Sequence, residues 1–483
     1  MKKYFWIIFG LFFVSRFFFL ANYPHFYDSP EYLRESLSGN FFKSLVASHE
    51  VVHPVWLFLT QIFQRIISQP TSWELSLISA LFGLMSFLAF YFLVKRNFNE
   101  KVALFSLIPL IFFPHLWLVQ TNVLHESLDH GLLLLALLCF DIFLTKKRFF
   151  YFLPALIFLA LSIFDFVGIL LWSTIFFGLV ILRFKRNDWW KNITWGFLIV
   201  FLSFVLALAG LYGLLSLTGN IEPISRLKIL LLGFGATGIF SDWGLLDILR
   251  MLRNDSLILV YGYSVAAILG LISSVIYLVK KKSWPLIIFL LSFFIPFILT
   301  GKFWYGGLSG RLAALIAYPL ALLLGIMPWS AWRRDRRKIY WVFMAILFLT
   351  FLPTFWAYQK TPVPKVQAGL IEEIGLQKED LLVLSDYQRP QLVYSNAVYL
   401  GGNREQQKMI EEKIEKKLST DGCVFISQQA IDFPYWQYDG QQIHIISKGN
   451  KDRAQLKEFL KDKELILVSE DKNYPLLNLY QVK

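Results

Sequence analysis

The chain has 483 residues, of which 56% are hydrophobic, 18% aromatic and 17% charged, and its mean hydropathy is +0.53. Soluble domains carry roughly 25% charged residues, so this composition excludes an ordinary soluble protein. The formal net charge of +13 resides in short Lys/Arg clusters between apolar runs. Such clusters are typical of cytoplasmic loops, which argues against nucleic-acid binding. Two cysteines, Cys139 and Cys423, are too few for a Cys-rich metal site.

Apolar runs near the roughly 20 residues needed to span a bilayer recur along the chain up to about Trp356. About eleven spans are predicted, at Tyr4–Leu20, Trp73–Val94, Val102–Val119, Gly131–Leu144, Phe149–Phe164, Gly168–Leu182, Trp195–Leu217, Leu257–Val279, Pro285–Leu299, Leu312–Met327 and Ile339–Trp356. No small-residue cleavage site follows the first run, so we expect an uncleaved first span. The sequence therefore predicts an all-α polytopic membrane protein.

One further run, His53–Ile67, is ambiguous because it is short and carries polar side chains at helical spacing. If it lies at the membrane interface, all the basic clusters fall on a single side of the membrane. Basic loops are normally cytoplasmic, so we predict an interfacial helix here. The N-terminus is then cytoplasmic and the C-terminus extracytoplasmic, in a multi-pass protein of the plasma membrane.

The tail, residues 358–483, is predicted to be a small extracytoplasmic α/β domain that follows a transmembrane domain of residues 1–357. Thr361–Pro364 is predicted to be its linker. Short β-branched runs alternate there with charged helical stretches. The predicted strands are Asp380–Ser385, Cys423–Ser427, Ile443–Ser447 and Leu465–Ser469, and the predicted helices are Arg404–Leu418 and Lys451–Lys461.

The first outer loop carries two carboxylates, Asp28 and Glu31, in the stretch His25–Tyr32. A carboxylate at such a position can take a proton from a hydroxyl or hold a metal that neutralises a phosphate. The alternative is that Asp28 caps a helix that begins near Pro30. Both interpretations can hold together.

The second outer loop carries another acidic pair, Glu126 and Asp129, flanked by His125 and His130. With Asp28, the pair could form a site for a divalent metal ion, the candidate cofactor. An ordinary polar loop is the alternative. His53, which precedes Pro54, could orient a substrate or a catalytic carboxylate, although a lone histidine is more often structural.

Two outer-side cations, Lys302 and Arg311, lie in a Gly-rich aromatic loop before the tenth span. An arginine there can bind a lipid phosphate through two parallel hydrogen bonds, or it can anchor the interface. Arg16, inside the first span, is expected to need an anionic partner. Asp165, between two short spans, is interpreted as a turn residue.

The order of these features along the chain resembles that in the polyprenyl-phosphate-sugar-dependent glycosyltransferases of the GT-C fold. The branch that it resembles is that of the protein mannosyltransferases and aminoarabinose transferases. An arginine in the first span precedes an Asp…Tyr loop (Asp28, Tyr32), and a His-Pro helix follows (His53-Pro54). An acidic loop then leads into a Leu-rich span, and Gly310-Arg311 opens a late span.

The resemblance implies that Asp28 is a catalytic carboxylate and that Glu126 or Asp129 is the acidic residue of the second loop. It also implies that Arg311, supported by Lys302 and Arg16, binds the donor phosphate. The chain departs from the family pattern at Ser29, Val55 and Leu312, where the family often has an acidic residue, a second proline and a tyrosine.

By this resemblance the expected activity is a hexosyl or pentosyl transfer from a polyprenyl-phosphate-linked sugar to a protein or glycolipid acceptor at the outer face. Glu31 and His53 would assist at the catalytic site. Two other classes stay open, a transporter or flippase of lipid-linked glycans and a non-catalytic membrane scaffold. A transporter would hold its polar groups at mid-membrane in broken helices, whereas here they gather in loops and at span ends.

Overall fold

The structure is a computed structural model. It describes residues 2–21, 32–33, 36, 40–42, 53–67, 72–183, 189–218, 244–303, 313–330, 334–360, 363–377, 379–385, 397–400, 404–420, 422–432, 436–438, 443–445 and 455–483. Two compact units can be distinguished. The first comprises Met1–Leu20, Ser38–Pro70 and Glu74–Phe355, and the second comprises Ala21–Leu37, Thr71–Trp73 and Trp356–Lys483. The predicted domain boundary after residue 357 stays a prediction.

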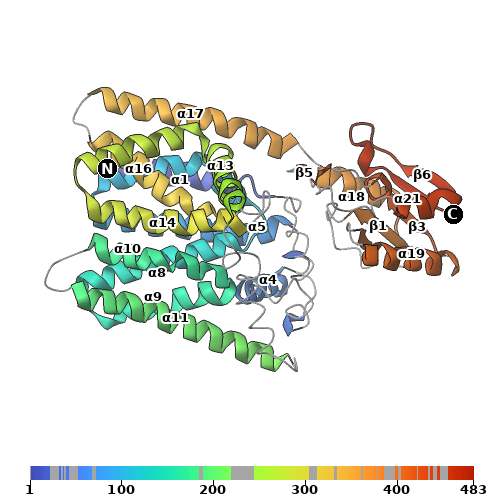
Figure 1. The fold of residues 1–483 in the computed structure, drawn as a ribbon, viewed down its shortest axis with the longest axis horizontal. Coiled ribbons are helices and arrows are strands. Elements are labelled where there is room, and N and C mark those ends of the chain that lie inside the picture. The colour runs from blue at the N-terminus through green and yellow to red at the C-terminus, as the bar shows by residue number, and fades with distance from the viewer. Residues whose placement is uncertain are drawn as a thin grey trace. The chain divides into compact units, whose positions relative to one another are not determined.

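The first unit is helical, and its long helices run side by side along one common direction (Figure 1). The helices are α1 (Lys2–Phe17), α4 (Pro54–Ile66), α5 (Ser72–Asn97), α6 (Glu100–Phe112), α7 (Pro114–Thr121), α8 (Glu126–Lys146), α9 (Phe149–Asp165), η1 (Val167–Ser173), α10 (Thr174–Leu182), α11 (Trp189–Leu217), α13 (Leu245–Lys280), α14 (Trp284–Phe303), η3 (Ala313–Ile316), α16 (Ala317–Ser330) and α17 (Arg334–Lys360). Each predicted apolar run has its counterpart among them.

In the described part of the chain, four helical segments are long and apolar enough to cross a bilayer, judged by length and composition. They are α5, α8, α11 and the Gly262–Lys280 part of α13. The pair α6 and α7, bent by 72°, would make a fifth span, and shorter apolar helices lie at α9, η1 with α10, α14, α16 and α17. The polytopic helical class is confirmed, and the number of eleven spans stays a prediction.

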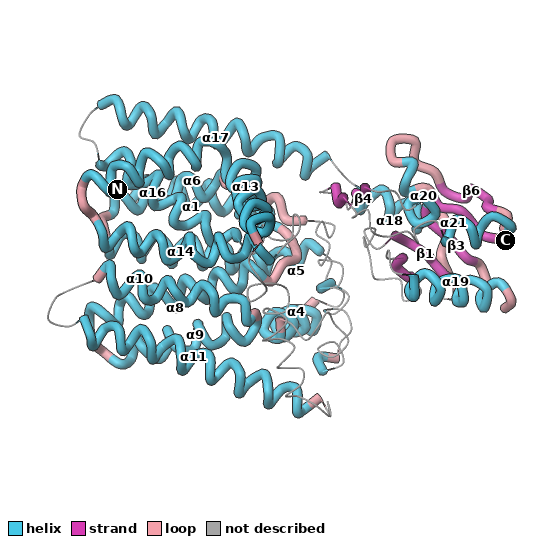
Figure 2. Tube along the Cα trace, in the orientation of Figure 1, coloured by secondary structure: helices cyan, strands magenta, loops and turns pink. Residues whose placement is uncertain are grey.

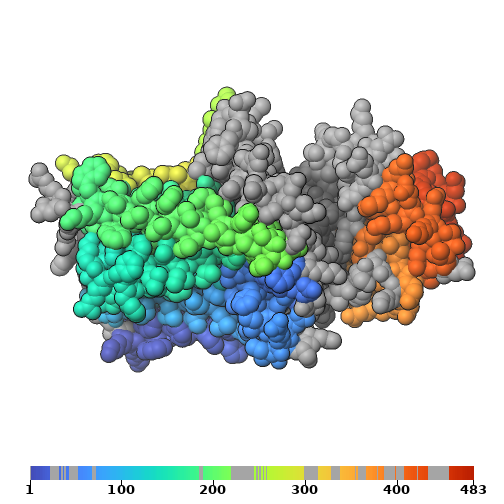
Figure 3. Space-filling model, turned by 90° about the horizontal axis from the view of Figure 1, so that it is seen from below, coloured from blue at the N-terminus to red at the C-terminus, as the bar shows by residue number. Residues whose placement is uncertain are grey.

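The outer surface of the bundle is apolar, as expected for helices that face lipid. On α11, for example, Phe197, Phe201 and Leu206 are exposed, and this helix lies along the face shown in Figure 3. Soluble proteins rarely expose such a contiguous apolar surface. The surface is consistent with a bundle whose polar groups are satisfied internally.

Among the described helices of the bundle, breaks occur between α6 and α7 and within α13. The break between α6 and α7 follows Phe113 and precedes Pro114, because proline disfavours helical conformation in the residue before it. The break in α13 lies at Ser264, whose φ of 76° and ψ of 151° are not helical. The breaks adjoin, since the rings of Phe113 and Tyr263 lie 5.2 Å apart.

Arg16 closes the broken end of α6. Its fully buried guanidinium donates hydrogen bonds to the carbonyl oxygens of Leu110 at 2.7 Å and Ile111 at 2.9 Å, and to Gln120 Oε1 at 3.0 Å. The guanidinium carbon also lies 4.4 Å from the ring centroid of Phe12. The last carbonyls of a helix lack intrahelical partners and carry partial negative charge. They therefore take the place of the anion that we expected beside Arg16.

The ambiguous run forms α4, which has 13 residues. At 1.5 Å per residue such a helix is about 20 Å long, shorter than the hydrocarbon core of about 30 Å. The helix begins at Pro54, directly after His53, as the His-Pro sequence predicted. Its length is consistent with the predicted interfacial position.

The second unit is an α/β domain, which confirms the predicted class (Figure 2). Its elements are α18 (Val363–Glu373), β1 (Leu381–Ser385), β2 (Ala397–Leu400), α19 (Arg404–Leu418), β3 (Val424–Ser427), α20 (Gln428–Asp432), β4 (Trp436–Tyr438), β5 (Ile443–Ile445), α21 (Gln455–Phe459), η5 (Leu460–Asp462), β6 (Leu465–Ser469), η6 (Pro475–Leu477) and β7 (Leu479–Val482). Among the residues of this domain that the structure describes, five strands form a sheet in the order β2-β1-β3-β7-β6, and β4 pairs with β5.

Strand β1 is buried on both faces, and its side chains divide between two cores. Leu381 and Val383 pack with residues of α19 and α21, whereas Leu382 and Leu384 pack with residues of α18. The strands β2, β1 and β3 are parallel, the arrangement usually covered by helices on both faces. The last residues of the predicted linker, Val363 and Pro364, instead begin α18.

We expect Arg16→Lys to lower the free energy of unfolding by about 2 kcal/mol, because an ammonium cannot reproduce the forked contacts with the α6 carbonyls. The midpoint of thermal unfolding in one detergent measures the effect. Arg65→Lys, at an exposed position on α4, is the control. Equal midpoints for the two variants would contradict the capping role of Arg16.

Candidate functional site

Three helix ends meet at a buried polar cluster, which comprises His53, His125, Glu126, Asp129 and Asp165. His53 precedes α4, His125 precedes α8, Glu126 and Asp129 lie in the first turn of α8, and Asp165 ends α9. All five residues are buried, with exposed fractions between 1% and 7%. The cluster thus combines three carboxyl groups and two imidazoles that are largely shielded from solvent.

Asp165 connects α9 to the start of α4. Its carbonyl oxygen accepts a hydrogen bond from the His53 amide at 3.1 Å, and its Oδ1 accepts one from the Trp56 amide at 2.8 Å. The first amides of a helix have no partner within the helix and are often capped by a carboxylate. Asp165 supplies such a cap from another helix, which places His53 inside the cluster.

His53 adopts a left-handed backbone conformation, with φ 73° and ψ 50°. Few residues other than glycine do so, and such strain tends to persist where the surroundings impose it. The imidazoles of His53 and His125 stack, with ring centroids 3.2 Å apart and planes inclined by 23°. Their Nδ1 atoms lie 3.8 Å and 3.9 Å from Asp165 Oδ2.

The carboxyl groups surround His125. Its Nδ1 lies 2.9 Å from Asp129 Oδ2, and its Nε2 lies 3.5 Å from Glu126 Oε1. The carboxyl groups of Asp129 and Asp165 also adjoin each other. Even with both imidazoles protonated, three ionised carboxylates would leave a net negative charge in a buried space. Such an arrangement requires shared protons or a cation for compensation.

A metal ion fits part of this cluster. His53, His125 and Asp165 each offer one ligand atom, and these atoms all lie within 4.8 Å of one another. Asp165 Oδ2 is buried and, in the described part of the chain, has no hydrogen-bond donor. Two imidazole nitrogens and one carboxylate oxygen form a common ligand set for zinc and other divalent transition metals.

The structure brings together three of the predicted site residues, namely His53, Glu126 and Asp129. Arg16 lies apart from them in its contacts with α6. Lys302 lies in the last turn of α14. Asp28, Glu31 and Arg311 lie outside the described residues, so the predicted metal set of Asp28, Glu126 and Asp129 is only partly described.

Asp165 was not predicted as a site residue, although it contacts more of the cluster than a turn residue would. The sequence offered one signal, an acidic residue directly at the end of an apolar helix, where charged side chains are rare unless functional. Its partners, His53 and Trp56, are more than 100 positions away in sequence. A local sequence pattern cannot predict a contact between residues so far apart in the chain.

We expect Asp165→Ala to destabilise the start of α4, because the Trp56 amide loses its acceptor. The loss of such a cap costs about 1 kcal/mol. Hydrogen–deuterium exchange of the peptide that contains Trp56 should be faster in Asp165→Ala, whereas Asp165→Asn keeps an acceptor oxygen and should retain most of the protection. Unchanged exchange in Asp165→Ala would contradict this cap.

The segment that builds the cluster matches a known family model. The model of dolichyl-phosphate-mannose-protein mannosyltransferases matches residues 51–212, a stretch that contains all five cluster residues. None of the curated proteins matches the sequence of this chain.

Solved structures share the fold. ArnT from Cupriavidus metallidurans, bound to undecaprenyl phosphate, is 12% identical with a TM-score of 0.63, over 100% of this chain and 97% of that chain. AglB from Archaeoglobus fulgidus, in complex with an inhibitory peptide and a dolichol-phosphate, is 13% identical with a TM-score of 0.56, over 98% of this chain and 80% of that chain. The family model and these structures confirm the resemblance to proteins of the GT-C fold.

Proposed function

We propose that the protein is an integral membrane glycosyltransferase that moves a sugar from a polyprenyl-phosphate donor to an acceptor at the outer face of the membrane. The observation that carries this proposal is the match of the mannosyltransferase family model to the segment that builds the carboxyl–imidazole cluster. The bound undecaprenyl phosphate of ArnT and dolichol-phosphate of AglB support a lipid-linked donor. The peptide bound to AglB supports a protein acceptor, and a glycolipid is the alternative.

In the proposed reaction the acceptor oxygen attacks C1 of the sugar. The bond from C1 to the phosphate oxygen breaks, polyprenyl phosphate leaves, and a carboxylate takes the acceptor proton. Displacement in one step would invert the configuration at C1. Asp28 is proposed as that base and Glu31 as its neighbour. Asp129, which His125 contacts at 2.9 Å, is proposed to orient the acceptor together with Glu126.

The leaving phosphate needs positive charge, and the described cluster is acidic. Arg311, with Lys302 in support, is proposed to bind this phosphate, because a guanidinium can contact two of its oxygens at once. A role of Arg16 in phosphate binding stays a prediction, since its described hydrogen bonds go to α6 and α7. A divalent cation bound by His53, His125 and Asp165 would neutralise the cluster and supply electrostatic stabilisation of the phosphate.

One observation is also compatible with the alternative function, a transporter. The breaks at Phe113 and Ser264 lie beside each other, and discontinuous helices form the substrate sites of many transporters. However, Arg16 occupies the carbonyl end of α6. The described site with an excess of carboxyl groups lies instead at the helix ends around Asp165. This arrangement favours transfer over transport.

We expect Asp129→Asn to lower the rate of sugar transfer from a polyprenyl-phosphate donor by about 100-fold. This is the lower end of the range of rate losses on removal of a group that takes part in proton transfer. The assay uses the full chain in lipid vesicles and measures polyprenyl phosphate release. Asp432→Asn, in an exposed ion pair with Lys457, is the control. Near wild-type transfer by both Asp129→Asn and Asp28→Asn would contradict the proposed site.

A second test concerns the cation. The purified protein, treated with a chelator and then incubated with zinc or manganese, should bind one equivalent of metal, as measured by plasma mass spectrometry. His125→Ala should abolish this binding, because the remaining two ligands are too few for a stable site. His115→Ala, on α7, is the control. If His125→Ala binds as much metal as His115→Ala, the metal proposal fails while the transferase proposal stands.

A further inference from the structure

A buried carboxyl group that the proposed reaction does not use lies on α13, at Asp255. The residue is 6% exposed, and in the described part of the chain neither of its carboxylate oxygens has a hydrogen-bond donor. Asp255 precedes the candidate span Gly262–Lys280 of the same helix. A buried polar group without a partner costs free energy, so its position in the structure requires an explanation.

The helix that carries Asp255 is divided at Ser264. The φ of 76° and ψ of 151° at this serine belong to a region that residues other than glycine rarely adopt, and such strain is common in segments that switch. The Ser264 hydroxyl accepts a hydrogen bond from the Ala266 amide at 3.2 Å, which caps the carboxyl half of α13 as a helix of its own. In Figure 1 the amino half is seen close to end-on, whereas the carboxyl half follows the bundle. A single strained residue thus joins two helices and can serve as a hinge.

The carboxyl half of α13 is closely packed on α16. Gly270 lies so near that an added Cβ would be 2.2 Å from Leu324 Cδ2. The Ser274 hydroxyl donates a hydrogen bond to the carbonyl oxygen of Leu323 at 3.0 Å. Tight backbone approach and a buried hydrogen bond therefore fix this half to the bundle.

The amino half of α13, Leu245–Tyr263, is attached differently. Among residues 245–261 whose side chains the structure describes, Asp255 is the one that is buried. Leu245, Leu249 and Leu252 are exposed, and their spacing places them together on another face of the helix. In its described part, the amino half is therefore held to the protein by a face that buries a carboxyl group.

The charged and titratable groups near Asp255 come from α13 itself and from α7, α14 and α16, which pack against it. The three neighbouring helices contribute His115, Lys302 and Tyr318, and the amino half of α13 adds Asp247, Arg250 and Arg253.

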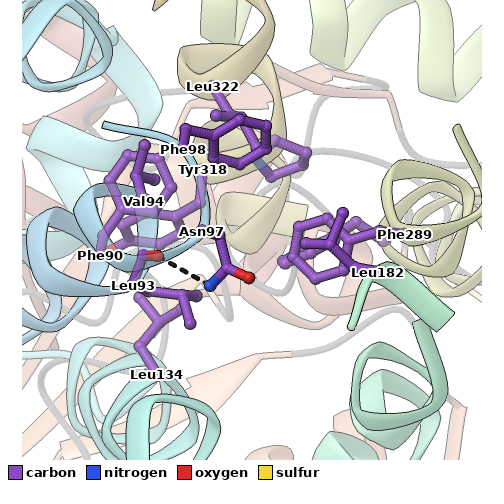
Figure 4. Close-up of a pocket in the computed structure, with 12 residues that line it drawn as sticks. Phe90, Leu93, Val94, Asn97, Phe98, Leu134, Leu182, Phe289, Tyr318 and Leu322 are labelled. Atoms are coloured by element: carbon purple, nitrogen blue, oxygen red, sulfur yellow. Dashed lines mark hydrogen bonds between the residues drawn. The ribbon is translucent and has the colours of Figure 1, made fainter. Parts of the chain in front are cut away.

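These groups do not compensate Asp255. His115 faces the break, because an added Cβ on Gly262 would lie 3.0 Å from His115 Cβ, and Arg253 is exposed. Tyr318 lines the apolar pocket in Figure 4, to which α13 contributes no described residue. No described side chain donates a hydrogen bond to Asp255, and burial raises the pKa of its carboxyl group to about 7.

We propose that the amino half of α13 is a flap, hinged at Ser264, which is closed while Asp255 is protonated and opens when Asp255 is ionised. In the closed state the neutral carboxyl group is buried. In the open state the proton has passed to water, the carboxylate is hydrated, and the contact between flap and bundle is lost. The carboxyl half of α13 stays on α16 in both states.

Two features distinguish a flap from an inert buried acid. A buried acid alone would not require the strained backbone at Ser264. It would also not explain why the close packing of α13 belongs to the carboxyl half. The flap adjoins α7 through Gly262 and His115, and His125 of the carboxyl–imidazole cluster follows α7. Opening would therefore change the packing beside the helix that leads into the cluster.

The direction of the pH dependence follows from burial. The closed flap raises the pKa of Asp255 to about 7, whereas an open flap returns it towards the ordinary value of 3.8. The closed state binds the proton more tightly, so it is most stable at low pH and loses stability as the pH rises to about 7. Between the two pKa values the equilibrium constant for opening rises about tenfold per pH unit, and above them it is constant.

Hydrogen–deuterium exchange of the full chain in lipid vesicles, read by mass spectrometry, tests the flap. Peptides from the amino half are compared at about pH 5.5 and about pH 8.5, after correction for the intrinsic exchange rates. Their protection should fall about 30-fold, because the opening constant rises up to the pKa of about 7. Peptides from the carboxyl half, residues 265–280, should show unchanged protection and are the internal control.

Variants assign the effect to Asp255. Asp255→Asn has a similar shape without the charge, so protection of its flap should be independent of pH and as high as that of the wild type at low pH. Asp255→Leu should behave in the same way and decides the outcome if Asp255→Asn does not fold, as reported by the unfolding midpoint. Asp432→Asn, which removes a carboxylate from an exposed ion pair, is the matched control and should show the wild-type loss.

Three results would overturn the proposal. The first is equal protection of the wild-type flap at both pH values. The second is an equal loss of protection in the uncharged Asp255 variants and the Asp432→Asn control, and the third is an equal loss in both halves of α13, which would mean that the whole helix loosens without a hinge. Every readout is amide exchange, so none of these results bears on the proposed transferase activity.

Discussion

The structure depends on one constraint: a charged group inside a membrane bundle must find its partner within the protein. Arg16 meets the constraint through the carbonyl end of α6, and Asp141 meets it through two arginines. The cluster around Asp165 differs from both. Its described members include more carboxyl groups than cations, and Asp165 Oδ2 has no donor among the described residues. An imbalance that costs stability is expected where it serves a function.

Helix ends explain why this cluster forms where it does. The positive end of the α8 dipole favours the carboxylates Glu126 and Asp129 in its first turn. Asp165 lies at the less favourable end of α9, and the amides at the start of α4 compensate for this position. Three helices thus bring polar groups together at their ends.

The sequence predicted those features that depend on local patterns. Apolar runs predicted the helices of the bundle, and the charged stretch Arg404–Leu418 coincides with α19. Contacts between residues that are distant in sequence were not predicted. Asp165 was interpreted as a turn residue because its hydrogen bond to Trp56 connects separate helices. The partner of Arg16 was expected to be an anion, because a broken helix that exposes carbonyl groups has no side-chain signature. The roles of Asp28 and Arg311 stay predictions.

The distribution of charge also distinguishes the proposed activity from its rivals. A scaffold has no need to bury three carboxyl groups with a strained His53, since each adds a cost without a contact that the fold requires. A transporter with broken helices would keep their ends available to its substrate, yet Arg16 already binds the last carbonyls of α6. The acidic cluster instead has its polar groups directed at one another around two stacked imidazoles. Such a cluster suits proton transfer or cation binding beside a phosphate, the two requirements of sugar transfer from a lipid carrier.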